Sequence, residues 1–209
     1  RFKYYHRPEE HLPGGNGARN YGFKMSQGEY VNWFDSDDLM VAEKLGMQIK
    51  QLEGNKDSLI SVCRTVFFRE NDMAQLNDEL IFFKSLYPLE DFIKKKAVFF
   101  TPSALISKQI LIQEKILFSE DLKAAQEWEF FCRLLYYLDN NIEYTNYKLV
   151  KIRRHANSIT GKINSVEIQW NYSLARLKVY EFLKEKNYQT KKLNDFFKHY
   201  FSKKYFVFI

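Results

Sequence analysis

Cysteine, glycine and proline are scarce in this 209-residue chain, which has 2, 8 and 4 of them. Two cysteines, Cys63 and Cys132, both inside apolar segments, exclude a disulfide scaffold and offer no zinc-ligand spacing. No apolar run approaches the roughly 18 residues that a membrane-spanning helix needs. Residues 1–12 are polar and aromatic, so we expect no cleavable signal there. A hydrophobic content of 45% excludes wholesale disorder.

Positive charge is concentrated near the end of the chain. Seven lysines against two acidic residues lie between positions 184 and 204, with Phe and Tyr interleaved. This pattern is typical of a terminal helix with a solvated lysine face and a packed aromatic face. It also fits an interfacial helix on anionic lipid. Binding of single-stranded nucleic acid is the least favoured reading, and we do not expect nucleic acid as a partner.

Hydrophobic periodicity and turn residues predict an α/β fold with a helical C-terminal part. We expect one domain over 1–160 and a basic, aromatic helical segment over 161–209. The predicted helices cover 16–26, 39–52, 76–87, 101–110 and 124–138, followed by two more from about 164. The predicted strands cover 30–34, 58–68 and 142–153.

Three carboxylates, Asp35, Asp37 and Asp38, follow the first predicted strand directly. They repel one another unless a positive group lies among them, and Mg²⁺ or Mn²⁺ with phosphate oxygens is the usual solution. The strand end is also where ligands collect in open α/β sheets. Two alternatives to a metal site stay open here. The first is structural, because Asp37 or Asp38 could cap a helix that starts at Leu39. The second is an aspartyl-phosphate phosphatase, whose D-x-D-x-[TV] pattern matches weakly because Leu39 is neither Thr nor Val.

Glu127 begins the apolar stripe of the predicted helix over 124–138. A carboxylate in that position is costly unless it opens onto a polar cleft, which is the setting a general base needs. The alternative is a favourable interaction with the positive helix N-terminus. Glu129, in contrast, is predicted to form an exposed pair with Arg133, four residues further on.

A basic group follows the last predicted strand, at Arg153, Arg154 and His155. These side chains could meet a diphosphate or could form a solvated strand end. The other histidines show no spacing typical of metal ligands.

The order of these motifs resembles glycosyltransferase family 2. That family typically shows N-x-G, A-R-N-x-G, G-E-Y-[IV] and D-x-D-D early in the chain, then an [EQ]-[DE]-W motif and a late R-x-H-x-x-S-I stretch. The corresponding segments here are N-G-A-R-N at 16–20, G-E-Y-V at 28–31, F-D-S-D-D at 34–38, T-P-S-A-L-I at 101–106, Q-E-W at 126–128 and R-H-A-N-S-I at 154–159. The resemblance covers about 16–160.

The resemblance implies a GT-A fold and transfer of a sugar, with inversion, from a nucleotide-sugar donor to a hydroxyl of a polysaccharide or lipid-linked acceptor. Asp37 and Asp38 would hold Mn²⁺ or Mg²⁺ and the donor diphosphate, and Glu127 would be the general base. The expected donor-binding residues are Asp35, Asp37, Asp38, Arg19, Asn20, Arg154 and His155.

Members of this family begin with a βαβ unit that grips the nucleotide, and this sequence starts downstream of it. We therefore expect roughly 60 to 90 residues of the family pattern to be absent. We expect a cytoplasmic enzyme that takes part in the synthesis of cell-surface polysaccharide. Its basic segment would rest on the inner face of the membrane. The alternative from another class is a non-enzymatic module that uses the basic segment to bind membrane or nucleic acid.

Overall fold

The computed structural model describes residues 2–69, 72–76, 85–154 and 165–205. Its strands are β1 (Tyr30–Val31), β2 (Leu39–Met40), β3 (Ile60–Arg69), β4 (Asp72–Leu76), β5 (Ala104–Ser107) and β6 (Ile142–Arg153). They form one mixed sheet in the order β1-β5-β3-β6-β2, with β4 paired to β3. β3 and β6 run parallel, and all other pairs are antiparallel.

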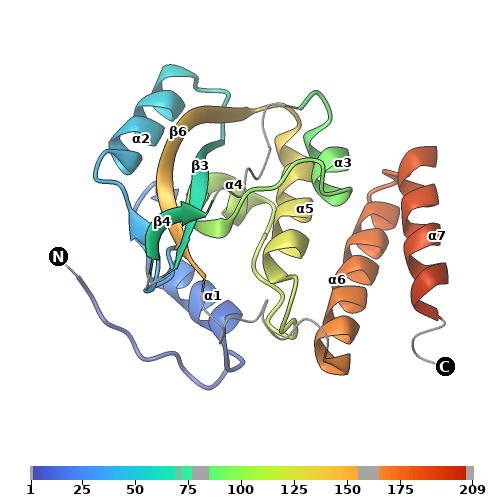
Figure 1. Cartoon of the computed structure of the whole chain (residues 1–209). Coiled ribbons are helices and arrows are strands. Elements are labelled where there is room, and N and C mark those ends of the chain that lie inside the picture. Colours follow the sequence, from blue (N-terminus) through green and yellow to red (C-terminus); the bar gives the residue numbers. More distant parts are fainter. Residues whose placement is uncertain (1, 70–71, 77–84, 155–164, 206–209) are drawn as a thin grey trace.

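Seven α-helices and one 3₁₀ helix accompany these strands in the described part of the chain. They are α1 (Gly15–Met25), α2 (Lys44–Gly54), α3 (Pro88–Ile93), η1 (Thr101–Ser103), α4 (Lys108–Gln113), α5 (Gln126–Leu138), α6 (Val166–Glu185) and α7 (Lys191–Tyr205). Helix α2 lies on one face of the curled sheet and α5 on the other, with α6 and α7 outside α5 (Figure 1). The predicted α/β fold with a helical C-terminal part is confirmed.

Several predicted elements are confirmed with nearly the same bounds. The strand over 142–153 is β6, whose bounds are the predicted ones, and the strand over 58–68 is β3. The helix over 16–26 is α1, and the helix over 124–138 is α5. The segment of α5 has a long, regular apolar stripe, which is where periodicity is most informative.

The helix predicted over 39–52 is wrong in its first turn. Leu39 and Met40 form the short strand β2, which pairs with Lys151 and Val150 of β6, and the helix begins only at Lys44. The apolar spacing continues across the boundary, so periodicity alone does not separate the strand from the helix. Because no helix starts at Leu39, the interpretation of Asp37 or Asp38 as its N-cap is also wrong.

The segment predicted as a helix over 101–110 is divided among η1, β5 and the start of α4. Strand β5 lies between β1 and β3, and its first three residues are buried. A strand covered on both faces is apolar throughout and resembles a buried helix in sequence. The predicted strand over 30–34 is shortened to Tyr30–Val31. In the helix predicted over 76–87, Leu76 ends β4, while 77–84 lie outside the described residues.

The C-terminal helices share the main hydrophobic core. Val179, Leu183, Leu193 and Phe197 are buried in the same cluster as the apolar face of α5. The lysines at 184, 186, 191, 192, 198 and 203 are exposed. The described part of α7 therefore packs its aromatic face inward and presents lysines to solvent. Among the described residues, no helix combines the length and apolarity needed to cross a bilayer.

Candidate active site

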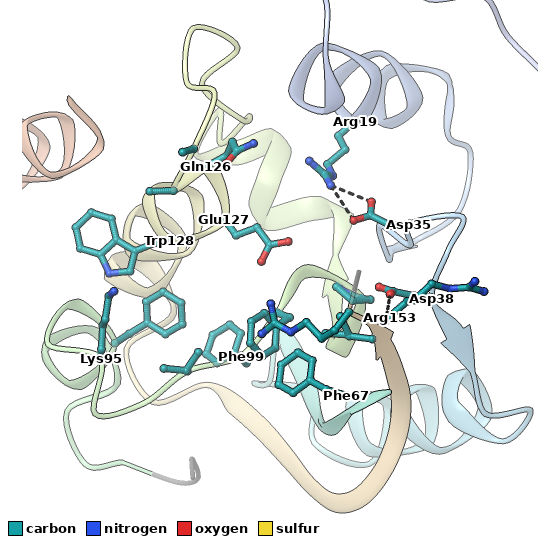
Figure 2. Close-up of a pocket in the computed structure, with 18 of the residues that line it drawn as sticks. Arg19, Asp35, Asp38, Phe67, Lys95, Phe99, Gln126, Glu127, Trp128 and Arg153 are labelled. Carbon is teal, nitrogen blue, oxygen red and sulfur yellow. Dashed lines mark hydrogen bonds and ion pairs between the residues drawn. The ribbon is translucent and has the colours of Figure 1, made fainter. Parts of the chain in front are cut away.

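A pocket of about 700 Å³ opens where the parallel strands β3 and β6 end. The turn with Asp35, Asp37 and Asp38 lines one side, and Glu127 at the start of α5 projects into the pocket from the other side (Figure 2). Aromatic residues such as Phe67 complete the lining. The fold thus brings the acidic turn and Glu127, which were both singled out in the sequence, to one cavity.

The acidic turn is held in place by backbone and side-chain hydrogen bonds. The Asp38 backbone amide donates to the Asp35 carbonyl at 3.2 Å, which closes the turn. The Arg153 backbone amide donates to Asp38 Oδ1 at 3.0 Å, and Arg153 Nε donates to the Asp37 carbonyl at 3.0 Å. Arg19 Nη2 contacts both carboxylate oxygens of Asp35, at 2.9 and 3.2 Å. The two Arg153 contacts follow from the pairing of β2 with β6, which brings Arg153 beside the turn.

Asp38 is the carboxyl group in the turn with a strongly altered proton affinity. Partial burial and the charges of Asp37, Asp35 and Glu127 raise its pKa to about 6, against the opposing hydrogen bond from the Arg153 amide. The pocket therefore contains an excess of negative charge at this end. A cation placed here would lower the cost of ionising Asp38.

Glu127 lies in the first turn of α5, ahead of a stripe of fully buried residues at 130, 131, 134, 135 and 138. Burial raises the pKa of its carboxyl group, and the charge of Asp35 acts in the same direction. Thr101 and the charge of Arg19 lower this pKa to a smaller extent. The prediction that Glu127 begins the buried face of this helix and opens onto a cleft is confirmed. A carboxylate with a raised pKa is a stronger base.

The acidic turn fits an open divalent-cation site better than a closed one. No cluster of three or more His, Cys, Asp or Glu with metal-binding geometry occurs in the described parts of the chain. Mg²⁺ and Mn²⁺ commonly take only one or two carboxylates and complete their shell with water and phosphate oxygens. Asp37 and Asp38 both line the pocket, and the raised pKa of Asp38 marks an unbalanced negative charge. The residues present therefore suit such an ion.

Of the expected donor-binding residues, Arg19, Asp35, Asp37, Asp38 and Arg154 line the pocket. The Arg154 guanidinium lies 4.0 Å from the centre of the Phe67 ring. Asn20 does not line the pocket. His155 lies outside the described residues.

Asn20 instead connects α1 to the segment at 118–120. Its amide nitrogen donates to the Phe118 carbonyl at 2.9 Å and to Glu120 Oε1 at 2.8 Å, and its Oδ1 accepts from the Phe118 amide at 2.9 Å. The side chain is buried, with its hydrogen-bonding groups used inside the protein. This arrangement orients α1, which bears Arg19.

The predicted solvent exposure of Glu129 is wrong. Its pair with Arg133 exists, with Oε1 2.6 Å from Arg133 Nε and Oε2 2.9 Å from Nη2. Glu129 is only 1% exposed, however, and Arg133 is half-buried, so the pair is largely shielded from solvent. The close packing of α5 on its neighbours covers the side chain that i,i+4 spacing alone places on the surface.

Among the pocket residues that were not singled out in the sequence, three carry polar or charged groups that bear on the site. Lys95 follows α3, and Tyr172 and Arg176 belong to α6. Arg176 lies in a helix with a weak apolar pattern, so the sequence around it does not indicate a binding site. Helix α6 comes near the pocket by packing against α5. Arg153 was noted only as part of the basic group, whereas it contacts the acidic turn directly.

The comparisons with known proteins identify the family and the fold. The model for glycosyl transferase family 2 matches residues 1–113, more than half of the chain. The chain therefore belongs to glycosyltransferase family 2. An uncharacterized glycosyltransferase of Rickettsia typhi is 26% identical over 185 residues, which are 81% of this chain and 55% of that protein.

Two further relatives have more specific names. An Escherichia coli protein named UDP-Glc:alpha-D-GlcNAc-diphosphoundecaprenol beta-1,3-glucosyltransferase is 39% identical over 51 residues, 24% of this chain and 20% of that protein. The solved structure of Staphylococcus aureus TarS with UDP-GlcNAc superimposes with a TM-score of 0.57 at 17% identity, covering 79% of this chain and 46% of that one. The GT-A fold is thereby confirmed. The chain spans about half the length of the first relatives it matches.

Asn20→Ala is expected to lower the free energy of unfolding by about 1–3 kcal/mol, because it leaves buried partners of its amide unsatisfied. Chemical denaturation measures this loss. The affinity for a nucleotide-sugar should change little in the folded variant. A large loss of that affinity without loss of stability would show instead that Asn20 contacts the donor.

Asp38→Asn is expected to stabilise the metal-free protein above pH 7. Because the pKa of Asp38 is raised to about 6 from 3.8, the folded state binds more protons between these values, and its stability falls as the pH rises through them. The neutral amide removes this loss, worth about 1 kcal/mol after solvent screening of a partly exposed group.

The measurement is urea denaturation in EDTA at pH 4.5 and 7.5, with the exposed Asp57→Asn as the control. The gain for Asp38→Asn should be full at pH 7.5 and clearly smaller at pH 4.5. An equal effect at both pH values would contradict the raised pKa.

Proposed function

We propose that this pocket transfers a sugar, with inversion, from a nucleotide-sugar donor to a hydroxyl of a glycan or lipid-linked acceptor. The observation that carries this proposal is Glu127 facing the Asp35–Asp38 turn across a single pocket. A base on one side and a diphosphate site on the other are the two components that a single displacement needs. The names of the E. coli relative and of the TarS complex support the classes of donor and acceptor.

Glu127 is the proposed general base. Its raised pKa favours removal of the proton from the acceptor hydroxyl as that oxygen attacks the anomeric carbon of the sugar. Attack from the face opposite the departing diphosphate inverts the configuration at that carbon. Burial at the start of α5 fixes the carboxylate in place before the acceptor arrives.

The acidic turn is proposed to bind the donor diphosphate. Asp37 and Asp38 would hold Mn²⁺ or Mg²⁺, which neutralises the diphosphate as it leaves. Arg19 keeps Asp35 oriented beside them through its two contacts with that carboxylate. Arg154, and His155 just after it, are proposed to contact the donor from the end of β6.

The proposed setting is cell-surface polysaccharide synthesis at the cytoplasmic face of a membrane. The exposed lysines of 184–203 would hold the protein near anionic lipid headgroups by charge. Phe197 is buried and Phe196 and Phe201 pack on the core, so the described aromatic residues of α7 favour this electrostatic contact over insertion.

Asp38→Ala in the full-length protein is expected to weaken Mn²⁺-dependent binding of a nucleotide-sugar by about tenfold or more, because an ion-contacting carboxylate is lost. Calorimetric titration with uridine, guanosine and thymidine diphospho-sugars, with and without Mn²⁺, measures it. Asp57→Ala is the control. Absence of any donor binding, together with salt-dependent nucleic-acid or lipid binding, would support a non-enzymatic module instead.

Glu127→Gln is expected to reduce turnover by about 10²–10⁴-fold, because the amide has the shape of the carboxylate but does not accept the proton. Donor affinity, measured by the same titration, should stay close to that of the unmodified protein. Turnover that survives this substitution would exclude Glu127 as the base.

A further inference from the structure

The pocket has a second end, beyond Glu127, with the opposite charge. Trp128 and Lys95 lie side by side there, on the other side of Glu127 from Asp35 and Asp38 (Figure 2). Arg176 lines the same end, with its guanidinium 4.7 Å from the centre of the Trp128 ring. This cationic end offers hydrogen-bond donors where the acidic turn offers acceptors.

Arg176 is a buried cation with no counter-charge among the described residues. It is 5% exposed and lies between the rings of Trp128 and Tyr200, each 4.7 Å away. Its Nη1 donates to the Tyr172 carbonyl at 2.8 Å, whereas its buried Nε has no hydrogen-bond partner in the part of the chain that the structure describes. No carboxylate of the described residues forms an ion pair with it. Aromatic contacts offset part of the desolvation cost, but they do not satisfy the N–H group.

Two more donors accompany Arg176. The indole Nε1 of Trp128 is also buried without a hydrogen-bond partner among the described residues. Lys95 has a left-handed backbone, with φ of 57°, and its side chain lines the pocket. Partial desolvation lowers the pKa of Lys95, and the charge of Arg176 lowers it further, so the two cations lie close enough to repel each other. Two cations and two unused N–H donors at one end of a cavity require a ligand that supplies several oxygen acceptors.

We propose that Lys95, Trp128 and Arg176 form a subsite for an oxyanion of the acceptor, a phosphate or a carboxylate. This inference rests on the proposed function, in which the donor occupies the acidic turn and the acceptor hydroxyl approaches Glu127. An anionic group is repelled by the acidic end unless a metal is present, and it is attracted by the cationic end without one. Glu127 lies between the two ends, where an acceptor anchored by its charge would meet the sugar.

The oxyanion could come from the phosphate of a lipid-linked or phosphate-bearing glycan, or from the carboxylate of an acidic sugar. Calorimetric titration of the full-length protein in EDTA distinguishes these sources with three probes. They are N-acetylglucosamine 1-phosphate, glucuronic acid and neutral N-acetylglucosamine. At least one charged probe should bind, and the neutral sugar should bind at least about tenfold more weakly. The tighter of the two charged probes identifies the source.

Lys95→Met is expected to weaken binding of the charged probe by about tenfold, which is the effect of losing one charged hydrogen bond. Lys96→Met is the matched control, because Lys96 is the next residue, is also exposed and does not line the pocket. Arg176→Met should have at least as large an effect. Since Arg176 is buried, the exposed Lys95 keeps the test valid if the Arg176 variant does not fold.

The same titration is repeated with UDP and Mn²⁺ bound, and the anion should still bind. Mutual exclusion would assign the cationic end to the donor and overturn the acceptor assignment. Equal affinities for Lys95→Met and Lys96→Met, or no anion binding in a protein that binds UDP, would overturn the subsite alone. Anion binding without any metal-dependent binding of UDP or a nucleotide-sugar would overturn the proposed function, and the acceptor assignment with it.

Discussion

The parallel pairing of β3 with β6 is the constraint on which the site depends. It aligns the carboxyl ends of two long strands, so that Phe67 of β3 pairs with Ile152 of β6 beside the pocket. The short strand β2 then pairs with β6 and holds the acidic turn against Arg153. Helix α5 packs its apolar face into the main core on one face of the sheet. Its first turn, with Glu127, lies at the pocket beside these strand ends. The site is thus assembled by a sheet and one helix.

Charge separation along one cavity is the physical theme of the site. Partial burial and the neighbouring carboxylates raise the pKa of Asp38 at the turn, while desolvation and the charge of Arg176 lower the pKa of Lys95 at the far end. Holding like charges close together and partly out of water costs folding free energy at each end of the pocket. Ligands of the opposite charge reduce this cost when they bind, so the folded protein becomes more stable when the pocket is occupied. Glu127 lies between the two ends (Figure 2).

Sequence reasoning predicted the fold class, the bounds of β6, and the residues of the acidic turn and Glu127. These signals are local: a long alternating strand, and charged residues where an apolar pattern begins or ends. It did not separate Leu39 from the following helix, because β2 exists only through its pairing with β6. It did not find Arg176 either, and it placed Glu129 in solvent. The environment of both side chains is decided by helices that pack from distant parts of the chain.

The stacking of Tyr200 on Arg176 ties the last described helix to the pocket interior. Helix α7 provides one of the aromatic walls that keep water away from the guanidinium, although none of its own residues lines the pocket. Shortening the chain before this helix would let water solvate Arg176, and a hydrated guanidinium has much less to gain from an anion. Helix α7 therefore shapes the surroundings of a pocket residue, although none of the described α7 residues lines the pocket.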